Sequence, residues 1–186
     1  MDFDFSNDQE QLRDAVRKWV DKGYTFERHN SIVREGGFSR AAWTELAELG
    51  LCGLYISEDH GGMGMGPTEG MLAMEELGRG IVMEPLAHAL IAGGVFSGYA
   101  PADVQAEWLP KVASGEALIV LAHQERKARY QLGKCEAKAT PAQAGWTLTA
   151  TKSIVPAGDQ ADAYLVPAMV EGTMAMFLVE RAASGV

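Results

Sequence analysis

The chain has 186 residues, of which 47% are hydrophobic and 22% are charged. This apolar content excludes a disordered tail, and the length is enough for one or two domains with cores of their own. The formal net charge of −9 argues against a dedicated nucleic-acid-binding protein, because such proteins normally carry a basic surface.

The apolar residues of positions 1–115 recur at helical spacing between residues that favour helix ends. Five helices are expected, and they begin at or near Ser6, Ser39, Pro67, Pro85 and Asp103. Ser6 with Gln9 resembles a capping box, and Asp103 is a candidate N-cap. Pro110 lies inside the last of these helices and predicts a kink or a break.

Residues 116–186 show strand patterns instead. Residues 117–122 form a continuous apolar run, which is typical of a buried strand. From Trp146 to Thr151 apolar residues alternate with threonines, as in a strand with one exposed face. Two more strands are expected at 163–170 and 173–179, joined by a short turn at Glu171-Gly172.

The acidic excess is confined to the helical part. Residues 1–115 hold 18 acidic and nine basic side chains, whereas residues 116–186 hold seven of each. The change in charge coincides with the change in apolar pattern. We therefore place a domain boundary near residues 114–116.

The N-terminus and the cysteines bear on where the protein works. The stretch MDFDFSNDQEQ is acidic and polar, unlike a secretory signal or a transit peptide. No apolar run is long enough for a membrane span. Cys52 and Cys135 are too few for a disulfide scaffold and fit a reducing compartment. These features predict a cytoplasmic protein without a membrane partner.

Two further patterns bear on ligands. The run His60–Gly66 does not fit G-x-G-x-x-G and lacks the context of a Rossmann unit, so we interpret it as a flexible turn. No two of the four histidines are spaced three or four residues apart, and neither cysteine is near one. We therefore expect no metal site.

A basic cluster follows the predicted buried strand. Its five cations lie within 13 positions and are Arg126, Lys127, Arg129, Lys134 and Lys138. Such a patch suits a polyanionic small molecule, for example a nucleotide or coenzyme A. An ordinary solvated loop explains the spacing equally well, so both interpretations stay open.

Several motifs in the same order resemble those of the acyl-CoA dehydrogenase family of flavoproteins. Residues 43–57, WTELAELGLCGLYIS, are similar to the family's L-x-x-L-G-L-x-G-L segment. Residues 58–64 resemble P-E-x-x-G-G-x-G, and residues 74–79 resemble x-E-E-L-G-R. Residues 108–116 are similar to Y-L-P-x-L-x-S-G-E. The resemblance runs in this order along nearly the whole chain.

The resemblance implies an α+β fold. An all-α N-terminal helical domain is expected at residues 1–115 and a mostly antiparallel, β-barrel-like middle domain at residues 116–186. The middle domain is expected to be incomplete, and the family's C-terminal four-helix bundle is absent from the sequence.

The resemblance also implies FAD-dependent α,β-dehydrogenation of an acyl-CoA thioester. The family's usual base is a glutamate of the C-terminal bundle, so no catalytic residue is assigned here, and we expect the chain as given to be inactive alone. The implied partners are an acyl-CoA substrate, electron-transfer flavoprotein or a similar acceptor, and further subunits in a homo- or hetero-oligomer.

Candidate site residues follow from the same resemblance. Those matched to the family's flavin-binding segments are His123, Gln124, Glu125, Tyr130, Ile154, Val155 and Pro156. Those on the substrate side are Leu90, Gly94, Val95, Arg126 and Arg129. Pro156 stands where the family has a flavin donor, although proline has no N–H or hydroxyl to give.

Residues 124–132 resemble a particular branch, the small subunit of pimeloyl-CoA dehydrogenase-like enzymes, which carries E-P-x-x-R-Y-x-L. Two alternative functions remain beside the dehydrogenase. One is a non-catalytic partner subunit of a heteromeric acyl-CoA dehydrogenase, which Pro156 and the altered Thr-Glu-Pro segment favour. The other is an acyl-CoA-binding module without redox activity.

Overall fold

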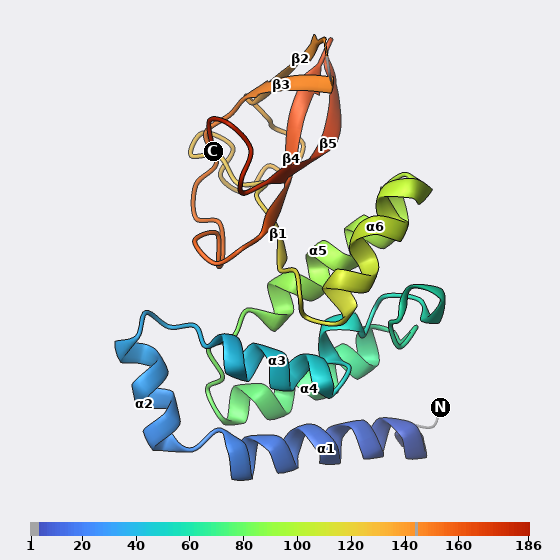
Figure 1. Cartoon of the computed structure of the whole chain (residues 1–186), viewed down its shortest axis with the longest axis vertical. Coiled ribbons are helices and arrows are strands. Elements are labelled where there is room, and N and C mark those ends of the chain that lie inside the picture. Colours follow the sequence, from blue (N-terminus) through green and yellow to red (C-terminus); the bar gives the residue numbers. More distant parts are fainter. Residues whose placement is uncertain (1–3, 144) are drawn as a thin grey trace. The chain divides into compact units, whose positions relative to one another are not determined.

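A computed structural model describes residues 4–143 and 145–186, so the first three residues of the polar N-terminal stretch lie outside the described part. The chain divides into two compact units, residues 1–116 and residues 117–186. In the described residues the first unit contains six α-helices and the second contains a five-stranded sheet (Figure 1). The predicted α+β class is confirmed.

The helices of the first unit are α1 (Asn7–Gly23), α2 (Phe26–Arg34), α3 (Arg40–Glu48), α4 (Pro67–Arg79), α5 (Leu86–Tyr99) and α6 (Ala102–Ala113), with short 3-10 helices η1 (Leu51–Gly53) and η2 (Glu58–His60). The predicted capping box is present: the Ser6 hydroxyl accepts from the Gln9 N–H, and the Gln9 side chain accepts from the Ser6 N–H. The Ser39 hydroxyl caps α3 by accepting from the Ala42 N–H.

Two helices differ from the sequence prediction. α2 was not predicted, because Ile32 is its one buried residue among those described and its other positions show no apolar stripe. α6 begins at Ala102, so Asp103 lies in its first turn and is not the N-cap. The helix also continues through Pro110, since Leu109 and Val112 on either side are buried in the core.

The core of the helical unit is built around Trp43, which is fully buried. Its indole N–H donates to the Gly115 carbonyl over 3.1 Å and so satisfies the one polar group of the ring. α5 is apolar on all sides, and it buries Leu86 and Phe96 while Ile91 is 52% exposed.

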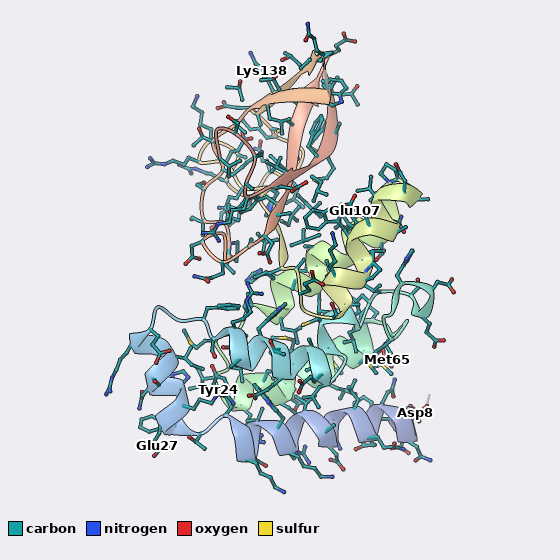
Figure 2. All side chains as sticks on the ribbon, viewed as in Figure 1. Asp8, Tyr24, Glu27, Met65, Glu107 and Lys138 are labelled. Carbon is teal, nitrogen blue, oxygen red and sulfur yellow. The ribbon has the colours of Figure 1, made fainter. Side chains whose placement is uncertain are left out.

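The glycine run between η2 and α4 is fixed by main-chain hydrogen bonds. The N–H of Gly64 donates to Ile56 O over 2.7 Å, and the N–H of Met65, labelled in Figure 2, donates to Leu54 O over 2.8 Å. A Cβ built on Gly62 would lie 2.1 Å from Ile56 O. The run is therefore a turn, as predicted, held by main-chain hydrogen bonds, and position 62 needs glycine because the backbone approaches closely there.

The strands of the second unit are β1 (Ile119–Leu121), β2 (Lys138–Ala142), β3 (Gly145–Thr149), β4 (Ala163–Val170) and β5 (Thr173–Glu180). β4 pairs antiparallel with β5 along its whole length, which confirms the predicted hairpin. The other edge of β4 pairs parallel with β1 at residues 163–165 and with β2 at Met169. β2, which starts at Lys138 (Figure 2), also pairs antiparallel with β3.

The sheet is thus mixed, and within the described residues it does not close into a barrel. β1 is shorter than the predicted apolar run, and β2 was not predicted because KATPA lacks a strand pattern.

Pro167 lies in the middle of β4 without breaking the sheet. Ala122 N–H donates to Leu165 O and Met169 N–H donates to Ala137 O, so this edge of β4 is shared between two partners. The position of Pro167 falls between them, where no partner needs an N–H donor. Its carbonyl accepts from Cys135 Sγ over 3.3 Å.

Candidate functional site

A hollow of about 470 Å³ in the second unit is lined by Gln124, Arg126, Arg129, Tyr130, Ser153 and Ile154. These residues come from two segments, one after β1 and one after β3. The Ser153 N–H donates to the Gln124 carbonyl over 2.9 Å and ties the segments together. Two stretches far apart in the sequence are therefore neighbours at one surface site.

Glu125 anchors the first segment from inside. It is 5% exposed, and its Oε1 accepts from Lys152 Nζ over 2.6 Å and from the Ala137 N–H over 3.1 Å. Its Oε2 accepts from the Glu136 N–H over 2.6 Å. One carboxylate thus joins the segment after β1, the residues just before β2 and the segment after β3, and so holds together the two segments that line the hollow.

The surroundings of Glu125 change its acidity. Burial opposes ionisation of the carboxyl group, but the hydrogen bonds from Lys152 and from the N–H groups of Glu136 and Ala137 outweigh it. Together they lower the pKa of Glu125 from 4.5 to about 2. The group is ionised at all physiological pH values and does not act as a proton donor there.

This pKa predicts a stability change in acid. The unfolded-state pKa of a glutamate is about 4.3, which is higher than the folded-state value. The stabilisation is therefore fully present above about pH 5 and is lost as the pH falls from about 4.3 through 2, for a total of about 3 kcal/mol. Urea unfolding of the wild type and of Glu125→Gln between pH 6 and pH 2.5 measures it. The wild type should lose more stability than the variant, and parallel pH profiles would contradict the assignment.

Both walls of the hollow carry strained backbone. Arg129 has φ of +48° and Ile154 has φ of +51°, the left-handed region that favours glycine. For a β-branched residue such as Ile154 this conformation is a genuine outlier, and strain of this kind costs on the order of 1–3 kcal/mol and clusters at functional sites. Ile154 is also 80% exposed and Tyr130 is 98% exposed. Exposed apolar surface in a hollow is typical of ligand binding.

The hollow offers polar groups as well. Within residues 4–143 and 145–186, the main-chain N–H groups of Gln124, Ile154 and Val155 have no hydrogen-bond partner. In the same part of the chain Arg126 and Arg129 form no ion pair, whereas Lys127 is 3.3 Å from Glu136. Free N–H donors, two cations and the exposed apolar surface of Ile154 and Tyr130 suit an anionic, planar ligand.

Four residues predicted for the cofactor do not line this hollow, namely His123, Glu125, Val155 and Pro156. His123 is exposed, and the Glu125 carboxylate points into the protein. Pro156 is the second residue of a β-turn in which the Gly158 N–H donates to Val155 O over 3.0 Å. Proline suits this turn position, where its missing N–H is not needed.

A second hollow of about 830 Å³ lies beside the sheet of the same unit. Its lining includes Val155, Lys152, Trp146, Phe177 and residues 182–186. Trp146 and Phe177 make an edge-to-face contact with ring centroids 5.6 Å apart. Val155 therefore lines this larger hollow, whereas Ile154, the residue before it, lines the smaller one.

The predicted acyl-pocket residues belong to α5 of the helical unit. Leu90 is buried, while Gly94 and Val95 are half-buried. A Cβ built on Gly94 would lie 3.8 Å from Cδ2 of Tyr55, an ordinary packing distance. Neither of the two hollows includes these residues.

Two residues of the site were not among the predicted ones. Ser153 lines the hollow, and Lys152 holds Glu125. Lys152 was visible in the sequence, since it is the one cation between Lys138 and Arg181. Ser153 had no signal beyond its position between Lys152 and Ile154. In the described residues no group of three potential ligands could hold a metal ion.

Comparison with known proteins identifies the family. The family described as "Acyl-CoA dehydrogenase, N-terminal domain" matches residues 6–116. Acyl-CoA dehydrogenase FadE12 of Mycobacterium tuberculosis is 29% identical over 164 residues, which are 87% of this chain and 42% of that relative. The solved ChsE4-ChsE5 complex from Mycobacterium tuberculosis has 27% identity and a TM-score of 0.87, with 100% of this chain and 50% of that chain covered.

A structure of PigA with FAD and proline has a TM-score of 0.89 over 100% of this chain and 51% of that chain; at 21% identity this shows the fold alone. The chain belongs to the acyl-CoA dehydrogenase family of flavoprotein oxidoreductases. It spans about half the length of the curated relatives that it matches. Among the described residues no helix has the length and apolar character needed to cross a bilayer.

Proposed function

We propose that this chain forms part of an FAD-dependent acyl-CoA dehydrogenase that introduces an α,β double bond into an acyl-CoA thioester. The observation that carries the proposal is the hollow at Gln124 and Ile154. There the two segments that resemble the family's flavin-binding segments lie side by side, with unpaired N–H groups and two arginines.

Residues of the hollow fit the needs of a flavin. The chemistry that FAD supplies when bound is acceptance of a hydride from the substrate β-carbon. The N–H groups of Gln124 and Ile154 have no partner in the described residues and would hold the electron-rich edge of the ring, and the exposed side chains of Ile154 and Tyr130 would offer it apolar contact. Glu125 and Lys152 position these segments from behind.

The base that removes the α-proton is proposed to lie outside these 186 residues. Among the described residues no carboxylate lines the hollow, and the nearest one in sequence, Glu125, is bound to Lys152 with a strongly lowered pKa. Its role is therefore positioning, and no catalytic residue is assigned in this chain.

The surroundings of the enzyme complete the proposal. We place the protein in the cytoplasm, with electron-transfer flavoprotein or a similar acceptor taking the electrons, and in a homo- or hetero-oligomer.

A second candidate function is a non-catalytic subunit of a heteromeric acyl-CoA dehydrogenase. It is supported by Pro156 in place of a flavin donor and by the likeness to a chain of the ChsE4-ChsE5 complex.

A flavin titration tests the proposed site. FAD is added to the purified chain, and binding is followed by the change in flavin fluorescence. Ile154→Glu places a negative charge at the hollow and removes the apolar side chain of Ile154, so we expect at least tenfold weaker binding, which corresponds to about 1.4 kcal/mol.

Met174→Glu is the matched control, since Met174 is another exposed apolar residue and lies outside both hollows. Equal affinity in the two variants would contradict this location of the flavin. Absence of FAD binding by the wild-type chain would favour the second candidate function.

A further inference from the structure

We propose that Arg126 and Arg129 form an oxyanion subsite on the rim of the hollow, which recognises a carboxylate or phosphate group of the acyl-CoA substrate. The choice of acyl-CoA as the ligand rests on the proposed function. The chemistry of the subsite rests on the two guanidinium groups themselves.

The first argument is the lack of counter-ions. In the second unit Lys127 pairs with Glu136 at 3.3 Å and Lys152 pairs with Glu125 at 2.6 Å. Arg126 and Arg129 line the same hollow, yet neither has an acidic partner within the described part of the chain. Two like charges at one site repel each other, and a bound anion relieves this repulsion.

The second argument is the backbone at Arg129. Its φ of +48° lies in the region where glycine is free of strain and other residues are not. Arginine at this position directs a cation to the hollow from a strained turn. Strained residues persist where the surroundings enforce them, and they are concentrated at ligand sites.

The third argument is the chemistry of the neighbouring groups. A guanidinium is planar and presents paired N–H donors that match the two oxygens of a carboxylate or the oxygens of a phosphate. The Tyr130 hydroxyl lines the same hollow and is a further donor. Gln124 and Ser153 make the rest of the polar lining neutral, so nothing acidic opposes an anion there.

Two sources of such an oxyanion are consistent with this site. One is a phosphate of the coenzyme A portion, which all acyl-CoA substrates share. The other is a carboxylate at the far end of the acyl group, which only dicarboxylic acyl-CoA substrates carry. The first makes Arg126 and Arg129 general binding residues, and the second makes them determinants of substrate specificity.

The test uses the purified 186-residue chain titrated separately with inorganic pyrophosphate and with glutarate, each followed by the backbone amide NMR shifts. We expect saturable shifts at residues 124–130 with one of the two anions. In Arg126→Gln/Arg129→Gln the binding should weaken at least tenfold, because two charge-assisted contacts are lost. Arg126→Lys/Arg129→Lys keeps the charge, and its affinity for the anion should lie between those of the wild type and of Arg126→Gln/Arg129→Gln.

Lys134→Gln/Lys138→Gln is the matched control, since it removes the same charge from the same unit outside the hollow. Preserved amide dispersion shows that each variant is folded. Binding of pyrophosphate that coenzyme A displaces and FAD does not displace assigns the subsite to coenzyme A, and binding of glutarate assigns it to the acyl group. Pyrophosphate displaced by FAD alone assigns the two arginines to the flavin and overturns the proposal. No saturable binding of either anion, or equal loss in the control, overturns the proposal.

The FAD titration separates this subsite from the flavin site. Anion binding without FAD binding supports the subsite and counts only against the proposed flavin. FAD binding without anion binding overturns the subsite and leaves the proposed function standing.

Discussion

Replacing Glu125 by leucine is expected to lower the free energy of unfolding of the second unit by about 3–5 kcal/mol. The change leaves the Lys152 ammonium buried without a counter-ion, since the Lys152 side chain is 7% exposed. It also removes the acceptor of the Glu136 and Ala137 N–H groups, which fix the start of β2. Urea unfolding followed by tryptophan fluorescence measures the loss, and Trp146 reports on this unit.

Two further variants show whether the buried pair is the cause. Glu125→Leu/Lys152→Met removes both charges and should recover a large part of the stability, because no isolated charge is left. Glu136→Gln breaks the exposed ion pair with Lys127 nearby and should cost less than about 1 kcal/mol. If Glu125→Leu stays within 1 kcal/mol of the wild type, Glu125 does not anchor the site.

Gly62→Ala is expected to destabilise the helical unit by about 3 kcal/mol. The added Cβ meets main-chain atoms, at 2.1 Å from Ile56 O and 2.6 Å from Gly53 O, and a backbone cannot turn aside as a flexible side chain does. To relieve the clash, residue 62 must move away from residues 53–56. This movement breaks the hydrogen bonds from Met63 N–H to Gly53 O and from Gly64 N–H to Ile56 O.

Gly78→Ala is the control for this substitution. Gly78 lies in α4 with nothing within 4 Å of its built Cβ, so alanine should stabilise the helix by roughly 0.5–1 kcal/mol. Thermal unfolding by circular dichroism at the helical wavelength compares the two variants. A Gly62→Ala protein as stable as the wild type would show that the loop yields to the methyl group.

Much of the fold is predictable from local signals. The capping box at Ser6, the N-cap at Ser39 and the hairpin turn at Glu171-Gly172 each act within a few residues, so the sequence alone reveals them. α2 escapes prediction because its stability depends on the contacts of Ile32 with Tyr24 and Ala42 rather than on its own pattern. The hydrogen-bonded structure of the glycine run could not be predicted for a similar reason, since its partners are carbonyl groups of residues 53–56.

The candidate site is predictable only in part. The sequence shows the basic cluster, but it does not show which of its cations form ion pairs: within the described residues Lys127 does, whereas the other four do not. The pairing of Glu125 with Lys152 joins segments that lie 27 positions apart, and no local pattern predicts such a contact. Nor does the sequence show that Ile154 takes a left-handed conformation, because β-branched residues rarely do.

The place of β4 in the sheet has a consequence for how the protein is made. Ile119 of β1 pairs with Ala163, so β1 has no partner strand until residues that a ribosome adds much later, whereas β2 pairs with β3, which follows it directly. The helical unit can fold before then, since its contacts lie within residues 1–116. Until β4 is made, the apolar stretch at 117–122 has no partner strand and can associate with other nascent chains. We therefore expect the yield of folded protein in a cell to depend on how quickly synthesis proceeds from β1 to β4.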